Sequence, residues 1–262
     1  MSFIETHIIE PEQAKPVIAV KEAFTALKDG GQYTLKITAF LGLVLGVLFW
    51  AEERFDINGI GGAVAQTLVE AIFIYYWHRF FLLEEAELTN SDYTPFVKRT
   101  LFYYLVLALT AIMLAFVFIA LVGGLSDTGT VALILAGTVA ALFVVLRIVL
   151  VFPAIAVGSD ARAMADAFVL SSGNATRLAA GYFLMLLIVL LAFFPAFIVL
   201  GYAEFSAPEM FANEGFILVS NLIIGFTAAV STLLWAGVNS SFYRQLGGDI
   251  PASASDETGI FE

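Results

Sequence analysis

The chain has 262 residues, of which 60% are apolar and only 13% are charged, and its mean hydropathy is +0.92. A soluble domain carries about 25% charged residues and about 45–50% apolar ones. So few charges cannot cover a water-facing surface, and 25 Phe residues leave too much apolar surface for a disordered chain. The composition therefore excludes both classes and indicates a protein whose main partner is a lipid bilayer.

The side-chain inventory also excludes several kinds of chemistry. The chain has no cysteine and only two histidines, so thiolate catalysis, disulfides and zinc–thiolate sites are absent and we expect no metal or cofactor. A net charge of −11 argues against a nucleic-acid partner, because phosphates need a basic face. The sequence lacks the H-E-x-x-H, G-x-S-x-G and Walker motifs, so we expect it not to be an enzyme.

The first predicted element is an amphipathic helix in a cytoplasmic N-terminal segment, 1–32. It begins at Pro16, whose missing N–H costs nothing in a first turn, and it stops at Gly30. Such a helix can lie in the head-group layer or pack on the end of a bundle. Its expected apolar face consists of Val17, Val20, Phe24 and Leu27.

The next segment, 33–246, is predicted to be an all-α transmembrane bundle of six helices arranged as three hairpins. A membrane helix needs about 20 apolar residues to cross a hydrocarbon core of about 30 Å. Six stretches meet this requirement, although the second contains Glu70 and the fourth contains Arg147. The six stretches are 33–51, 59–81, 100–126, 128–152, 178–203 and 215–243.

The distribution of Lys and Arg predicts the orientation. With six spans, eleven of the twelve basic residues lie on the side of the two termini, and only Arg54 lies on the other side. Positively charged residues stay in the cytoplasm, so we expect both termini there. The eleven are Lys15, Lys21, Lys28, Lys36, Arg79, Lys98, Arg99, Arg147, Arg162, Arg177 and Arg244.

Two further segments are expected on the cytoplasmic side. An amphipathic helix is predicted between Ser159 and Gly173, with a possible i,i+4 pair of Arg162 and Asp166. The acidic tail, 247–262, is small and polar and is expected to be disordered.

The most informative candidate residues are Glu70 and Arg147, because a charged side chain inside a membrane is costly and needs a partner. Counted from the predicted cytoplasmic helix ends, the two residues reach similar depth, so we favour a structural ion pair between them. The alternatives are a proton or transport site, or an interfacial Arg147 if the fourth helix stops at Pro153.

The sixth predicted helix carries the other candidate residues. Asn221, Thr227, Ser231 and Asn239 could form a polar seam that lines a path, although such groups more often hydrogen-bond between membrane helices.

Two backbone features are expected in other predicted helices. The spacing of Gly42 and Gly46 permits a close approach between helices, and Pro195 is expected to kink the fifth helix.

The run Leu146–Gly158 (LRIVLVFPAIAVG), together with 165–177 and Ser241–Arg244, resembles a superfamily of bacterial six-span inner-membrane proteins. It includes the YciC-like proteins and the membrane domain fused to some glycerophosphodiester phosphodiesterases. The resemblance implies a fold and a location in the bacterial inner membrane, and no activity, because the soluble catalytic domain has no counterpart in this sequence.

Two functions follow as hypotheses. The favoured one is an integral membrane protein without catalytic activity that organises or regulates lipids or membrane-protein partners. The alternative is a transporter of small solutes or lipids that uses Glu70 and Arg147 inside the bundle.

Overall fold

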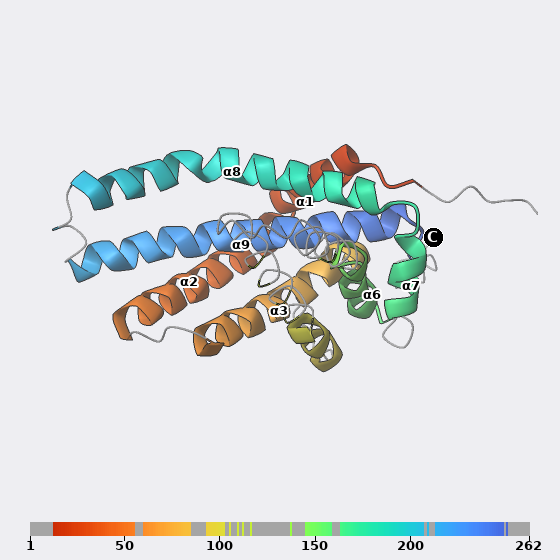
Figure 1. The fold of residues 1–262 in the computed structure, drawn as a ribbon, viewed down its shortest axis with the longest axis horizontal. Coiled ribbons are helices and arrows are strands. Elements are labelled where there is room, and N and C mark those ends of the chain that lie inside the picture. The colour runs from red at the N-terminus through yellow and green to blue at the C-terminus, as the bar shows by residue number, and fades with distance from the viewer. Residues whose placement is uncertain are drawn as a thin grey trace, which may run out of the picture.

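The computed structural model describes residues 13–55, 60–84, 93–102, 145–158, 163–206 and 213–248, and the single positions 105, 109, 112, 116, 137, 209 and 250. These residues form helices joined by turns, and none of them lies in a strand. The helices in Figure 1 are α1 (Pro16–Asp29), α2 (Gly31–Phe55), α3 (Ile60–Leu83), α6 (Val151–Ala156), α7 (Ala163–Leu170), α8 (Ala175–Ser206) and α9 (Glu214–Gln245).

Three helices are long and apolar enough to cross a membrane: Gly31–Phe55, Ala175–Tyr202 and Glu214–Gln245. They correspond to the first, fifth and sixth predicted spans, and α3 is a helix over the second. Most of the third and fourth predicted spans lie outside the described residues, as do Arg162 and nearly all of the acidic tail. The structure therefore confirms an all-helical chain with membrane-length helices, and the count of six spans stays a prediction.

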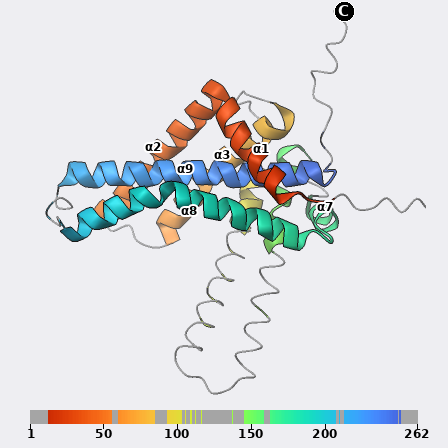
Figure 2. The ribbon, with the colours of Figure 1, turned by 90° about the horizontal axis from the view of Figure 1, so that it is seen from above.

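Helix α9 occupies the centre of the arrangement. It packs against α1, α2, α3, α6 and α8, and Figures 1 and 2 show the other helices distributed around it. Its first turn is capped by Asn213, whose Oδ1 accepts hydrogen bonds from the backbone N–H groups of Gly215 at 2.9 Å and Phe216 at 3.3 Å. The other helices are thus positioned through one common partner.

The contact between α2 and α9 depends on three glycines. A Cβ atom on Gly225 of α9 would lie 2.3 Å from the backbone N of Gly46 and 2.5 Å from the carbonyl O of Gly42. These distances leave no room for a side chain, so the two backbones touch directly. The small-residue spacing at Gly42 and Gly46 is therefore the α2 side of this contact.

Helix α1 is present where the sequence predicts it, and most of its expected apolar face is buried. Val20 is buried, and Phe24 and Leu27 pack partly buried against the core, whereas Val17 is 69% exposed. The small residues Ala19 and Ala23 are buried as well. At the crossing with α9, a Cβ on Gly237 would lie 2.9 Å from the Cβ of Ala23, so small residues set the distance between the two helices.

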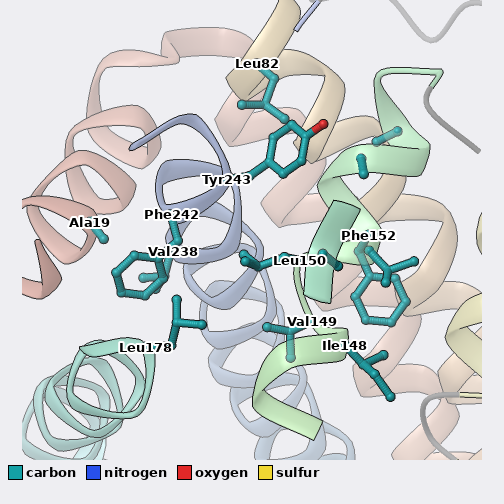
Figure 3. Close-up of a cluster of buried hydrophobic side chains, with 14 of the residues drawn as sticks. Ala19, Leu82, Ile148, Val149, Leu150, Phe152, Leu178, Val238, Phe242 and Tyr243 are labelled. Carbon is teal, nitrogen blue, oxygen red and sulfur yellow. The ribbon is translucent and has the colours of Figure 1, made fainter. Parts of the chain in front are cut away.

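The described residues form two buried apolar clusters, a larger one and a smaller one that includes Leu41, Trp77 and Leu233. Figure 3 shows Phe242 and Tyr243 of α9 with Leu150 and Phe152 from the α6 region and Leu178 of α8. The other half of α8 is apolar and open. Large side chains there are well exposed: Leu191 66%, Phe194 58%, Val199 66%, Tyr202 70% and Phe205 89%. In water such a surface is unfavourable, and in hydrocarbon it costs nothing.

Helix α8 continues through Pro195 from Ala175 to Ser206. Within the described part of the amphipathic helix predicted over 159–173, α7 covers Ala163–Leu170 and turns follow from Ser171.

The first prediction concerns the glycine contact. Gly225→Ala should lower the free energy of unfolding by about 1–3 kcal/mol, because its methyl group forces α2 away from α9. The measurement is reversible unfolding in detergent. Gly201→Ala in α8 is the matched control, since a Cβ there meets no atom within 4 Å. It should leave stability unchanged or raise it by up to about 1 kcal/mol. Equal losses in both variants would contradict the assignment.

Candidate functional site

Glu70 lies in the middle of α3 and is only 6% exposed. Its Oε1 accepts a hydrogen bond from Nε2 of Gln66, one turn earlier on the same helix, at 2.9 Å. An amide donor offsets part of the cost of burying the carboxyl group. One hydrogen-bond partner of the Glu70 carboxyl group therefore comes from its own helix.

Arg147 has partners other than the one expected from the sequence. Its Nη2 donates to the carbonyl O of Phe168 at 2.6 Å, its Nε donates to Oγ of Ser171 at 3.0 Å, and its guanidinium carbon lies 4.9 Å from the centre of the Phe168 ring. All these groups belong to the end of α7. Arg147 thus satisfies carbonyl and hydroxyl groups at a helix C-terminus, which favours a cation.

A second arginine acts in the same way on the neighbouring short helix. Arg79 lies near the end of α3, and its Nη1 donates a hydrogen bond at 2.9 Å to the carbonyl O of Ala156. Ala156 is the last residue of α6. This role of the two arginines is not predicted from the sequence. The available signal is that the last turns of α6 and α7 contain no basic residue of their own, which leaves their carbonyl groups to a cation from elsewhere in the chain.

The four residues of the predicted polar seam do not form one continuous path. Nδ2 of Asn221 donates to Oε2 of Glu53 on α2 at 2.7 Å. Thr227 and Ser231 donate instead to carbonyl groups four residues earlier in α9, at 2.9 and 2.8 Å. Asn239 accepts a hydrogen bond from the hydroxyl group of Tyr182 on α8, at 2.6 Å. Two members therefore join helices together, and two are satisfied within α9.

Asn239 lies on the wall of a cavity of about 400 Å³, which we call the α9 chamber. Trp235, which also lines it, stacks on Tyr182 with ring centres 4.8 Å apart. The lining residues come from α3, from the helical residues 94–102, from the α6 region, from α8 and from α9, and most are apolar. Among the described residues, the lining consists of Ile74, Thr100, Val145, Leu146, Val149, Phe152, Tyr182, Thr232, Trp235, Ala236 and Asn239.

The volume of the α9 chamber falls within the range of small-molecule sites, about 300–1,000 Å³. Its polar groups are already partly used, since Thr100 donates to the carbonyl O of Phe96 at 2.9 Å and Tyr182 donates to Asn239. A chamber with apolar walls and few unused donors binds hydrocarbon better than water. The described residues that line it include no Asp, Glu, His, Lys or Arg.

His78 is fully buried beside this region. Its Nδ1 lies 2.7 Å from Oγ of Ser240, and its ring meets Phe96 edge-on with centres 5.9 Å apart. Among the described residues, no three His, Asp or Glu side chains lie close enough together to share a metal ion. His78 therefore belongs to the packing between α3 and α9.

The fold defines a helical protein with three helices long enough to cross a membrane. Comparison with protein-family models, with curated proteins and with solved structures gives no match to this chain.

The second prediction separates the partners of Arg147 from those of Glu70. Arg147→Gln should lower the free energy of unfolding by about 1.5–3 kcal/mol, because charge-assisted bonds to the end of α7 are lost. In a double-mutant cycle with Glu70→Gln, unfolding in detergent should give a coupling energy below about 0.5 kcal/mol. A coupling of 1 kcal/mol or more would show that the two side chains form the predicted ion pair.

Proposed function

We propose that this chain is a multi-pass integral membrane protein that binds and organises membrane lipid and has no catalytic activity. Its location is the bacterial inner membrane, with six spans in three hairpins and both termini in the cytoplasm. The observation that carries the lipid role is the α9 chamber, an apolar cavity of about 400 Å³ inside a helical protein.

The open face of α8 supports the membrane placement. Phe183, Leu191 and Phe205 are 67%, 66% and 89% exposed, and a soluble protein would cover side chains of this size. A helix of 32 residues is about 48 Å long at about 1.5 Å per residue, enough for a hydrocarbon core of about 30 Å and both interfaces.

The ion pairs at the ends of α9 support the same placement in a membrane. Arg54 and Glu214 form an ion pair at 3.0 Å where α2 ends and α9 begins, and Arg244 pairs with Glu22 at 2.8 Å where α9 ends. Charged groups thus pair at the two ends of α9, where a membrane protein meets water. The resemblance to YciC-like proteins is consistent with this placement and belongs to the proposal.

The α9 chamber suits one hydrocarbon chain of a membrane lipid. Its walls are aliphatic and aromatic, and the Tyr182–Asn239 pair can accept a single polar group at its edge. Bound lipid would tie the α3 and α6 regions to α8 and α9, and would thereby stabilise the bundle by mass action. The transporter alternative needs a polar path past Glu70, and the separate partners of Arg147 favour the lipid role over it.

The third prediction tests the topology. The chain has no cysteine, so single cysteines introduced at exposed positions can be labelled without background. Lys28→Cys and Ser172→Cys should resist a membrane-impermeant maleimide in intact cells and react after permeabilisation. Glu209→Cys should react in both conditions. If Lys28→Cys and Ser172→Cys are labelled on opposite sides, an odd number of crossings separates them and the six-span topology is wrong.

The fourth prediction tests the α9 chamber. Thr232→Phe places a ring in the cavity, so native mass spectrometry of the purified protein should show the loss of lipid retained by the wild type. Ile223→Phe is the control, since Ile223 lies on the same helix and is 41% exposed away from the cavity. It should retain lipid. Lipid retained equally by both variants, with the fold intact by circular dichroism, would refute the lipid role of the chamber.

A further inference from the structure

A second cavity lies between α1, α3 and the end of α9, and we call it the α1 groove. Its volume is about 560 Å³. One wall is apolar, with Phe80 and Phe81 of α3 facing Ile18 of α1. The polar side chains at its rim are Lys21, Glu22, Thr25 and Arg244. The groove is separate from the α9 chamber, with which it shares no lining residue.

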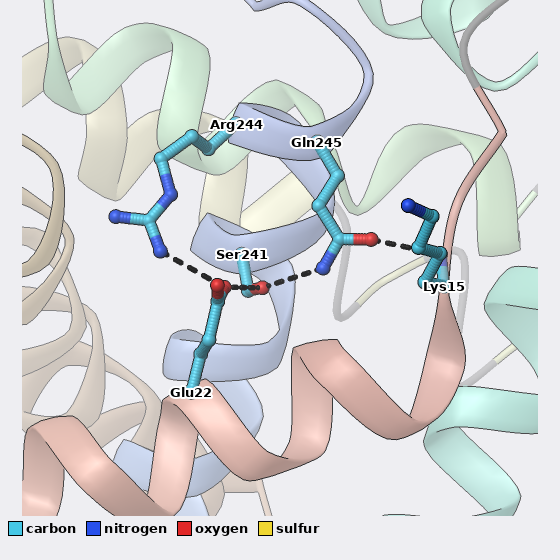
Figure 4. A network of polar contacts seen from close by, with 5 residues as sticks. All are labelled: Lys15, Glu22, Ser241, Arg244 and Gln245. Atoms are coloured by element: carbon cyan, nitrogen blue, oxygen red, sulfur yellow. Dashed lines mark hydrogen bonds and ion pairs between the residues drawn. The ribbon is translucent and has the colours of Figure 1, made fainter.

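Arg244 is held in place on two sides. Its Nη2 pairs with Oε2 of Glu22 at 2.8 Å, and its guanidinium carbon lies 5.2 Å from the centre of the Phe81 ring. Figure 4 shows that the hydroxyl group of Ser241 donates to the same Glu22 oxygen. A guanidinium group has five N–H donors, and one ion pair leaves several of them for another acceptor.

The support behind Glu22 extends to the start of α1. Nε2 of Gln245 donates to Oγ of Ser241 at 3.0 Å, and Oε1 of Gln245 accepts a hydrogen bond from the backbone N–H of Lys15 at 2.8 Å (Figure 4). Ser241 itself is fully buried. The network therefore fixes α1 against α9 and holds the rim of the groove in one arrangement before any ligand arrives.

Lys21 supplies the second cation. It lies one residue before Glu22 on α1, it is exposed, and among the described residues it has no acidic partner. Lys21 and Arg244 together carry two positive charges against the single negative charge of Glu22. In a chain with a net charge of −11, this rim has a net charge of +1.

We propose that the α1 groove binds the phosphate of an anionic membrane phospholipid, with Lys21 and Arg244 as its ligands. A phosphodiester carries one negative charge, which matches the net charge of the rim, and accepts hydrogen bonds from both side chains. The apolar lining reaches the surface at Ile18, which is 40% exposed, and the neighbouring Val17 of α1 is 69% exposed. Acyl chains attached to the phosphate can therefore lie along α1. This proposal rests on the proposed function, which places the chain among lipids.

The experiment uses the full chain purified in detergent and freed of lipid. The thermal unfolding midpoint is followed while phosphatidylglycerol, phosphatidylcholine or inorganic phosphate is added. Phosphatidylglycerol should raise the midpoint of the wild type, and Lys21→Gln should weaken its apparent affinity about fivefold, as expected for one basic residue near an anionic lipid. High salt should reduce the effect in the wild type.

Lys28→Gln is the matched control. Lys28 is an exposed lysine of the same helix, but it does not line the groove, so this variant should respond like the wild type. Since Lys21 forms no ion pair with any described residue, both variants should fold with unchanged midpoints in the absence of lipid. Equal responses of the two variants to phosphatidylglycerol would overturn the proposal.

Three other outcomes would also overturn it. Equal stabilisation by phosphatidylcholine would show that charge is not recognised, and equal stabilisation by inorganic phosphate would indicate a site for a free anion. A peptide of residues 249–262 that matches phosphatidylglycerol would identify the acidic tail as the occupant. Failure here is distinguishable from failure of the proposed function, because Thr232→Phe tests the α9 chamber and leaves the α1 groove unchanged.

Discussion

The direct backbone contact between α2 and α9 is the constraint on which the rest of the structure depends. Gly42, Gly46 and Gly225 bring the two helices so close that no side chain fits between them. In lipid, hydrophobic burial does not drive helices together, so dense van der Waals packing must do so. Once α9 is fixed against α2, its other faces are available to α1, α3, α6 and α8.

The same principle explains how α1 is attached. Ala23 lies close to Gly237 of α9, and this approach brings Glu22 within reach of Ser241 and Arg244. A larger residue at the crossing would separate the two helices and break that polar network. The apolar wall and the basic rim of the α1 groove are thus consequences of small residues at a helix crossing.

The sequence was a good guide to the helices and a poor guide to their contacts. Continuous apolar stretches predict α2, α8 and α9 because hydrocarbon requires about 20 such residues in any membrane helix. The apolar stripe expected on α1 was wrong at Val17, because a helix in or near lipid has no need to bury its largest side chains. Periodicity identifies a buried face reliably only where the alternative to burial is water.

The polar residues were harder to place for a related reason. An intramembrane charge needs a partner, but backbone carbonyl groups at helix ends satisfy that need as well as an opposite charge does. Arg147 contacts Phe168 and Ser171 in this way, and nothing in the sequence ranks a carbonyl group against Glu70. Asn239 was identified as polar, but its partner Tyr182 lies 57 residues away and became visible only in the structure.

The distribution of polar contacts along α9 links packing to the proposed role. Asn221 contacts Glu53 towards one end, and Ser241 and Arg244 contact Glu22 at the other. Between these ends, α9 meets its neighbours through glycine, through apolar side chains and through the wall of the α9 chamber, with polar contacts at Asn239 and Ser240. Because the ends are fixed by polar contacts, the volume between them can be left open without separating the helices. In the proposed lipid role, this arrangement lets the frame of the bundle stay in place whether the chamber is filled or empty.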